Sequence, residues 1–305
     1  MAKLRQVSDL DLKLLRSFAE IVDRGGFAAA QSTLNISQSV ISEHLKTLEI
    51  RLGFTLCKRG PGGFKLMPEG EEVYKAAKQL FAAVDAFRAN VSEIGDEVSG
   101  ELIVAVEDEV IANPSCRLAE ALKKFTAEVG RRVRFRIEIM AGYQALSHVA
   151  DGSAHIGLSV SDARARDVYS QRLFDETVEL YCAQGHPLHD VPDEMITQEM
   201  IAEQPYSNRG HLELRDLALL THGFRLGDVG MGAQAQLALI LSGRDVGYLP
   251  DHLVASVATG GRLRSIRPDL TRRVIPINMV MREGGPQVKL VSRMRACLVA
   301  AHSAS

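Results

Sequence analysis

The sequence lacks the features that mark a secreted, membrane-spanning or disulfide-rich protein. Its 305 residues contain only four cysteines, at positions 57, 116, 182 and 297, with no Cys-x-x-Cys pair and no histidine spaced to join one. Such scattered thiols indicate a reducing compartment and argue against a disulfide framework or a zinc site. No apolar stretch follows a basic start, and no apolar run is long enough to cross a bilayer. We therefore expect a cytoplasmic protein with no membrane partner.

Motifs of the common enzyme classes are missing as well. The sequence contains no nucleophile elbow, no Walker loop and no His-Glu-x-x-His pattern. His186 and His189 are close enough to suggest a metal site, but Pro187 opposes the helix that would align them, which favours a surface turn. We expect a protein that is not an enzyme and that has neither a metal nor a cofactor.

The formal net charge of -2 conceals an uneven distribution of charge along the chain. Residues 1–67 contain ten Lys and Arg against six Asp and Glu, whereas residues 68–100 contain three against seven. A basic end beside an acidic connector favours phosphate contact that is confined to residues 1–67.

Two helical segments meet across a tight turn between residues 27 and 52. The second segment has an apolar stripe at spacings of four, three and four, formed by Ile41, Leu45, Leu48 and Leu52. Ser37 is placed to cap the start of this helix, and Asn35 to end the helix before it. The pattern predicts a helix-turn-helix whose second helix enters a DNA major groove. A pair of core helices would have a similar pattern, and the segments that follow favour the first interpretation.

A short hairpin is predicted directly after the helix pair. The turn Gly60-Pro61-Gly62-Gly63 separates two strand-like pieces that carry Lys58, Arg59 and Lys65. This arrangement predicts a β-hairpin wing whose cations contact the DNA backbone, with Arg59 on phosphate or in the minor groove. Any surface hairpin can carry three bases, but the position after the helix pair favours a wing.

A long helix is predicted to begin at Pro68 and Glu69, since proline and acids favour helix starts. Apolar residues then recur at alternating steps of four and three, at Val73, Ala77, Leu80, Val84, Phe87, Val91 and Ile94. A seven-residue repeat of this kind is typical of paired helices, which predicts a dimer. The same stripe could instead pack on its own domain. The segment ends at Ser99 and Gly100.

From residue 101 onwards strand and helix patterns alternate in two units. The first unit has strands near residues 102–106, 133–139 and 155–160 with helices between them. This βαβαβ pattern implies a mostly parallel sheet. The second unit has strands near residues 169–174, 178–183, 224–226 and 246–249 and helices near 212–221 and 237–241. A strand at 274–281 and a helix at 288–300 complete the chain.

The first hundred residues resemble the LysR-type transcriptional regulators. The match rests on Phe27, Ala30, Leu34, the run 36–42, Leu48, Glu49, Leu56, Arg59, Leu66 and Gly70. The rest of the chain is similar more weakly, through Gly185-His186-Pro187-Leu188 and Gly247-Tyr248-Leu249-Pro250. The resemblance therefore covers nearly the full length.

The resemblance implies an α/β protein with a winged helix-turn-helix, a long linker helix and a two-lobed effector domain similar to type 2 periplasmic binding proteins. The expected boundaries are 1–67 for DNA binding, 68–100 for the linker, and 101–305 for the effector domain, with lobe 1 at 101–161 and 268–305 and lobe 2 at 162–267. The resemblance also implies homodimers or tetramers, double-stranded promoter DNA, RNA polymerase and a small-molecule effector as partners.

The sequence departs from the usual pattern of these regulators at several positions. Gln31 stands in place of a second alanine, Glu43-His44 replaces an Arg-Gln pair, Gly62 replaces a wing arginine and Met67 a threonine. A glutamate on the DNA side can accept a hydrogen bond from a cytosine amine but repels phosphate. These differences bear on which operator sequence is recognised.

The start of the second helix supplies the other candidate DNA contacts. Hydroxyls and backbone N–H groups at Ser37, Gln38 and Ser39 can hold phosphate oxygens at the positive helix end. Gln38 and Ser42 are candidates for base edges, with glutamine suited to adenine. Lys46, one turn further, is a phosphate candidate. For each of these residues the alternative is a solvated polar side chain.

Candidate effector-binding residues follow from the position of strand ends. In a doubly wound sheet, ligands sit where strand C-termini and helix N-termini converge, here between the lobes. The first strand of the sheet runs into Glu107, Asp108 and Glu109, which motivates the hypothesis of a cationic, amine-bearing or strongly hydrogen-bonding effector rather than a simple carboxylate. Alternatively, these acids favour a helix start and face water. The other candidates are Tyr143, Gln144, Tyr206, Ser207 and Asn208.

A transport-type binding protein is the remaining alternative. Residues 101–305 are compatible with one, but the missing signal peptide and the amino-terminal domain argue against it.

Overall fold

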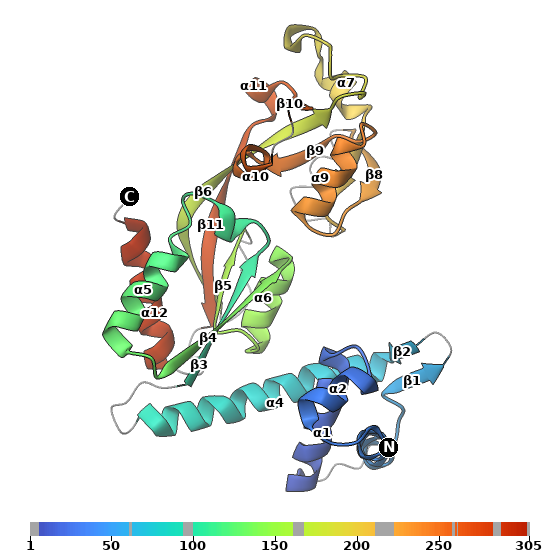
Figure 1. Ribbon diagram of the computed structural model, residues 1–305, viewed down its shortest axis with the longest axis vertical. Coiled ribbons are helices and arrows are strands. Elements are labelled where there is room, and N and C mark those ends of the chain that lie inside the picture. The colour runs from blue at the N-terminus through green and yellow to red at the C-terminus, as the bar shows by residue number, and fades with distance from the viewer. Residues whose placement is uncertain are drawn as a thin grey trace. The chain divides into compact units, whose positions relative to one another are not determined.

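The computed structural model describes residues 6–60, 63–93, 100–160, 168–210, 223–257, 260, 262–282 and 288–303. The chain divides into two compact units, residues 1–91 and, apart from residues 151–153, residues 92–305. The first unit is mostly helical, and the second combines strands with helices (Figure 1). No helix in the part of the chain that the structure describes could span a membrane.

The first unit has the elements that the sequence predicts. They are α1 (Asp9–Asp23), α2 (Phe27–Leu34), α3 (Gln38–Leu52), β1 (Cys57–Gly60), β2 (Gly63–Leu66) and α4 (Pro68–Glu93). Asn35 adopts a left-handed φ of 52° and ends α2. The Ser37 hydroxyl accepts the Val40 N–H and starts α3. The predicted winged helix-turn-helix order is therefore confirmed.

The core of this unit joins all four helices to the wing. The predicted stripe of α3 is buried along its whole length, at Ile41, Leu45, Leu48 and Leu52. It packs with Phe18 and other residues of α1 and with Ala77 of α4. Fully burying a side chain such as Leu48 contributes about 1.5–3 kcal/mol, so this stripe fixes which face of α3 is left outside.

A close backbone approach fixes where α4 begins. A Cβ atom on Gly70 would lie only 2.0 Å from the Leu56 carbonyl oxygen. The same oxygen accepts the Met67 N–H at 2.9 Å. Only glycine leaves room for this contact, which holds the start of α4 against the base of the wing.

The second unit contains two sheets and the helices that cover them. Its elements are β3 (Gly100–Glu107), η1 (Val110–Ala112), α5 (Leu118–Val129), β4 (Val133–Met140), α6 (Gly142–Asp151), β5 (Ile156–Ser159), β6 (Val168–Ala183), η2 (Asp193–Met195), α7 (Gln198–Ala202), β7 (Pro205–Asn208), β8 (Arg225–Val229), α9 (Ala233–Leu241), β9 (Gly247–Pro250), α10 (Asp251–Ser256), β10 (Leu263–Ser265), α11 (Pro268–Thr271), β11 (Arg273–Arg282) and α12 (Val288–Ser303). The strand order of the larger sheet is β10-β6-β11-β5-β3-β4, and β9 also pairs with β6.

The predicted βαβαβ pattern is confirmed, but the whole sheet is mixed. β3 runs parallel to β4 and to β5. β11 is antiparallel to both β5 and β6, and β6 is antiparallel to β9 and β10. In the smaller sheet β7 and β8 are parallel.

The expectation of two strands near 169–174 and 178–183 is wrong, because β6 is continuous from Val168 to Ala183. Residues 175–177, which lie between the two expected strands, pair with β11, where Glu176 lies opposite Ile275. The register of this pairing shifts between Ile277 and Asn278 of β11. The predicted helix near 212–221 and the segment 161–167 lie outside the described residues.

β6 and β11 connect the two halves of this unit, which we call lobe 1 and lobe 2. Lobe 1 comprises β3, β4, β5, α5, α6 and α12, and lobe 2 comprises β7 to β10, α7 and α9 to α11. Figure 1 shows α5 and α12 side by side on one face of the lobe 1 sheet. The core of lobe 1 lies between these helices and the sheet and includes Phe125 of α5, Leu158 of β5 and Met294 of α12.

Candidate nucleic-acid interface and ligand site

The exposed start of α3 presents three neighbouring polar side chains. Ser37, Gln38 and Ser39 are all exposed, and the Ser37 and Ser39 hydroxyls lie 2.8 Å apart. The positive end of the helix dipole lies at the same place. These groups can therefore hold phosphate oxygens.

Ser42 and Lys46 continue the same face of α3. Lys46 is exposed, and Ser42 is half-buried. The Ser42 hydroxyl donates a hydrogen bond to the Gln38 carbonyl at 2.7 Å. The Ser42 hydroxyl must therefore break this hydrogen bond and rotate away from the helix backbone before it can donate to a base.

Two polar contacts attach α3 to α1, and the sequence analysis missed both. Arg51 donates two hydrogen bonds to the buried carboxylate of Asp11, at 2.5 and 2.8 Å. The Arg51 guanidinium, together with the Ser8 cap, holds the pKa of Asp11 well below its usual range. His44 Nδ1 lies 2.8 Å from the Ser17 hydroxyl. The spacing Ser8-x-x-Asp11 is a capping signal that could have identified Asp11 in advance.

The wing is joined to α3 by Glu49. Its Oε1 accepts the Leu56 N–H at 2.8 Å and the Cys57 N–H at 3.5 Å. Lys58 and Lys65 lie directly opposite each other in the hairpin and are both exposed. Residues opposite each other share one face of a hairpin, so these two cations project together. The side chain of Arg59 lies outside the described residues.

The apolar stripe of α4 is used in two ways. Ala77 is buried in the core of its own unit, and Val73 and Leu80 pack against that core. Phe87 and Val91 are 68% and 49% exposed. The alternative of packing within one domain therefore holds for the first half of the stripe. Val84 is half-buried, Ile94 lies outside the described residues, and the role of the stripe in dimerisation stays a prediction.

Glu107, at the end of β3, is tied to the end of β5. Its buried carboxylate accepts hydrogen bonds from the Ser159 hydroxyl at 3.0 Å and the Val160 N–H at 2.8 Å. The pairing of β3 with β5 explains this contact, because parallel strand ends meet at one edge.

Asp108 reaches across to lobe 2 and caps α9. Its carboxylate accepts the Ala233 N–H at 2.6 Å. No side chain at the start of α9 caps this helix, since its N-cap residue is Gly232. Asp108 therefore satisfies a helix start that lies 125 positions away in sequence.

Glu109 joins the lobes through its backbone. It has a left-handed φ of 69°, and its carbonyl oxygen lies 3.0 Å from His252 Nε2 on α10. The other ring nitrogen of His252 lies 3.3 Å from the Asn113 amide and 3.9 Å from Glu176. The three consecutive acids thus have three different surroundings, and they do not converge on one point.

The remaining ligand candidates are spread over both lobes. Tyr143 is half-buried at the start of α6, and Gln144 beside it is exposed and accepts the Ala141 N–H. Ser207 and Asn208 are buried at the end of β7. Tyr206 is buried in the core of lobe 2, with its ring edge-on to two other aromatic rings, which supports a packing role.

Two polar residues near these candidates were not predicted from the sequence. Gln236 of α9 is buried and donates to the Ser207 carbonyl at 2.6 Å. Arg209 donates to the Gln236 side chain at 3.1 Å. Nothing in the local pattern marks Gln236, because it lies within an apolar helix. Among the described residues, no group of three or more His, Cys, Asp or Glu could hold a metal ion.

Two family models match the chain and together span most of it. The model described as "Bacterial regulatory helix-turn-helix protein, lysR family" matches residues 12–71. The model described as "LysR substrate binding domain" matches residues 95–303.

Curated relatives match along most of their length. The HTH-type transcriptional activator BauR of Pseudomonas aeruginosa is 35% identical over 287 residues, covering 92% of each chain. The HTH-type transcriptional regulator PtxR of the same species is 25% identical over 276 residues, covering 88% of this chain and 85% of its own.

Solved structures share the fold at lower identity. CbnR in complex with its target DNA matches with a TM-score of 0.61 at 18% identity, over 95% of this chain and 99% of that one. ArgP from Mycobacterium tuberculosis matches with a TM-score of 0.55 at 17% identity, over 98% of each chain.

Proposed function

The chain belongs to the LysR family of transcriptional regulators, and from that membership we propose which of its residues meet DNA, a second subunit and an effector. It is a transcriptional regulator with a helix-turn-helix DNA-binding domain and an effector-binding domain. One observation carries the residue-level proposal: α3 buries its apolar stripe completely, while its polar start at Ser37 and Gln38 is exposed.

We divide the chain by these functions. Residues 1–67 bind DNA, residues 68–100 link and dimerise, and residues 101–305, which form the two lobes, bind the effector. The break between β2 and α4, at Met67, and the start of β3 at Gly100 support these boundaries.

The start of α3 contacts both the DNA backbone and the bases. Ser37, Ser39 and Lys46 hold phosphate oxygens, supported by their exposure at or near the positive end of the helix. Gln38 and Ser42 contact base edges in the major groove.

The wing adds backbone contacts beside this helix. Lys58 and Lys65 approach phosphates from their shared face of the hairpin, and Arg59 contacts phosphate or the minor groove. The hydrogen bonds between Glu49 and the residues at the base of the wing support a fixed spacing between wing and α3.

The second half of α4 pairs with the same helix of another subunit. Phe87 and Val91 are large apolar side chains left in water, and pairing would bury them together with Val84 and Ile94. Val73, Ala77 and Leu80 support the pair from inside the unit. A dimer presents two Gln38 positions to one duplex, and two dimers form a tetramer.

The effector acts on the contacts that join the lobes. A ligand that displaces Asp108 from α9, or His252 from the Glu109 carbonyl, changes how lobe 1 meets lobe 2, and the paired subunits transmit the change to DNA. Tyr143, Gln144, Ser207 and Asn208 are further contacts, and Tyr206 supports them from the core.

An amine-bearing effector is our hypothesis for the class of ligand. The Glu109 carboxylate has no ion-pair partner among the described residues, so it is able to receive a cation. Calorimetric titration of the full chain with matched amines and carboxylates tests this choice. Tight binding of a simple carboxylate alone would contradict it.

We also propose that the protein is cytoplasmic, contacts RNA polymerase and has no catalytic activity. The relatives that match along their length are named as transcriptional regulators, which supports a role beside the chromosome.

Retardation of DNA migration tests the proposed function. The full chain should retard DNA from the intergenic region upstream of its own gene, and a chain lacking residues 1–67 should not. Footprinting with and without a panel of metabolites then identifies the operator and the effector. If both chains retarded the DNA equally, binding would not depend on the winged helix-turn-helix.

A further inference from the structure

Lobe 2 contains a cavity that none of the proposed effector contacts lines. Its volume is about 510 Å³, and its walls come from α7, α11 and the first residues of β8 and β11, with β9 behind them. Its apolar and cationic lining residues include Ile201, Phe224, Arg225, Tyr248, Leu270 and Arg273. The volume lies within the range of small-molecule sites, about 300–1,000 Å³.

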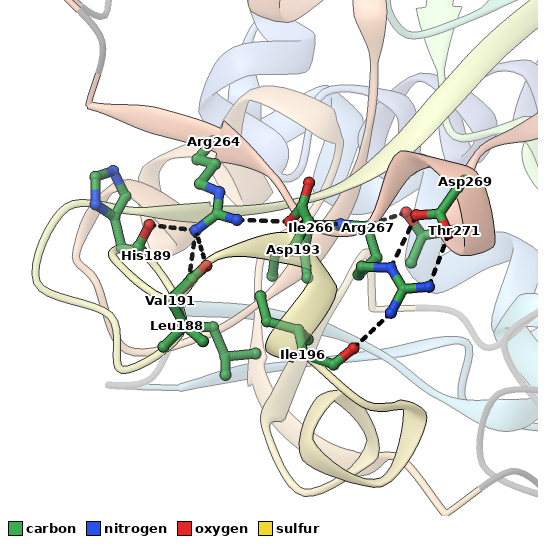
Figure 2. A network of polar contacts seen from close by, with 10 residues as sticks. All are labelled: Leu188, His189, Val191, Asp193, Ile196, Arg264, Ile266, Arg267, Asp269 and Thr271. Atoms are coloured by element: carbon green, nitrogen blue, oxygen red, sulfur yellow. Dashed lines mark hydrogen bonds and ion pairs between the residues drawn. The ribbon is translucent and has the colours of Figure 1, made fainter.

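A network of arginine contacts holds two walls of this cavity in place (Figure 2). Arg267 donates to the Ile196 carbonyl, just before α7, at 2.7 Å and makes two hydrogen bonds to Asp269 of α11 at 2.9 and 2.7 Å. Arg264 donates to Asp193 and to three carbonyls of the loop before it, those of Leu188, His189 and Val191. The cavity is therefore bordered by segments that are tied together before any ligand arrives.

The cations of this cavity are available to a ligand. The Arg273 guanidinium lies 4.5 Å from the centre of the Tyr248 ring, and neither it nor Arg225 forms an ion pair with any described residue. The Tyr248 side chain also accepts a hydrogen bond from Arg273, which fixes the guanidinium and leaves its other N–H groups for a carboxylate.

Among the described lining residues, the acids beside the two arginines are Glu199 and Glu203. Hydrogen bonds from its own backbone N–H and from Thr197 lower the pKa of Glu199, so this carboxylate stays ionised and is held at the start of its own helix. Both acids repel an anion, which must therefore lie against Arg225 and Arg273.

The apolar side of the cavity is suited to a flat group. Phe224 and Tyr248 are half-buried aromatic rings, each edge-on to the buried Tyr206 behind them. Ile201 and Leu270 add aliphatic surface. Aromatic and aliphatic walls with a few cations are typical of sites for amphipathic anions.

We propose that this cavity is a second small-molecule site, separate from the contacts between the lobes, and that it binds a small organic anion with a flat apolar body. Arg273 and Arg225 hold the carboxylate, and the rings of Tyr248 and Phe224 pack against the body. Glu199 and Glu203 disfavour the ligand by repulsion of like charge.

Calorimetry of the full chain with 3-phenylpropionate and its neutral amide tests the site. We expect saturable binding of the acid and at least about tenfold weaker binding of the amide. Arg225→Gln and Arg273→Gln should each weaken the acid by about tenfold, and Glu203→Gln should strengthen it about twofold. The matched control is Arg293→Gln, an exposed position on α12.

Two results would overturn the site. One is the absence of saturable binding to the wild type. The other is loss of binding in Gln236→Ala with no loss in Arg225→Gln, because the anion would then bind between the lobes. Because Arg225 is exposed, Arg225→Gln should fold normally. This variant therefore tests the site even if Arg273→Gln is unstable. If both arginine variants still retard DNA, a loss of anion binding concerns this cavity alone and leaves the proposed DNA-binding function intact.

Discussion

The DNA-binding unit and the effector-binding unit build their candidate sites in different ways. In the first, the exposed polar residues lie within a few positions of one another on α3 and in the wing. In the second, contacts between the lobes join residues that are far apart, as Asp108 joins Ala233 over 125 positions and Glu109 joins His252 over 143. A local surface can be recognised from periodicity and caps, whereas a surface made by tertiary contacts cannot.

The largest expected effect tests whether the α3 surface depends on its buried stripe. Leu48→Ala should destabilise the DNA-binding unit by about 2–5 kcal/mol, because Leu48 is fully buried and the core cannot close over the loss. In urea unfolding of the full chain, the transition in which DNA binding is lost should move to a lower urea concentration. Ile50→Ala is the control, since Ile50 is 71% exposed, and it should change the stability by less than about 0.5 kcal/mol.

The second prediction concerns base recognition. Gln38→Ala should change the preference at one base pair of the operator by about 1–3 kcal/mol. Fluorescence anisotropy with a set of single-base operator variants measures it, and Gln184→Ala, an exposed glutamine of the other unit, is the control. An equal loss of affinity for every variant would mean that Gln38 does not contact a base.

The third prediction concerns the contact between Asp108 and α9, which joins the two lobes of the effector-binding unit. Asp108→Ala should destabilise the effector-binding unit by about 0.5–2 kcal/mol, since α9 loses its cap. Glu194→Ala, at an exposed acid in η2, should have no measurable effect. Thermal unfolding of both variants decides, and equal behaviour would show that Asp108 does not join the lobes in solution.

The smallest of the stability effects concerns Asp11. Asp11→Asn should lower the melting temperature of the DNA-binding unit by about 5 °C at pH 7, as the contact with Arg51 is weakened. The folded pKa of Asp11 is depressed, so its contribution is present above the unfolded pKa of about 3.9 and is lost as the pH falls below it. The difference from wild type should therefore shrink below about pH 4.

The sequence predicts the first unit almost completely, for reasons visible in particular residues. Asn35 and Ser37 mark the turn through their own caps, and the stripe from Ile41 to Leu52 defines the buried face. The contact between Asp11 and Arg51 was missed because it spans 40 positions.

In the second unit the strands and helices were predicted better than their contacts. The three acids from the end of β3 onwards suggested one ligand site, but Glu107 bonds to the end of β5 and Asp108 caps a helix of the other lobe. β6 was divided into two strands because the pairing with β11 that keeps it extended is not visible locally. Tyr206 was expected to contact the effector, but its ring is packed in the core of lobe 2.

The salt dependence of operator binding tests most directly the claim that a local cationic surface holds the DNA. The slope of log affinity against log salt should fall by about one unit in Arg59→Ala and stay unchanged in Arg293→Ala. Equal slopes for wild type and Arg59→Ala would remove this wing residue from the interface and contradict the account.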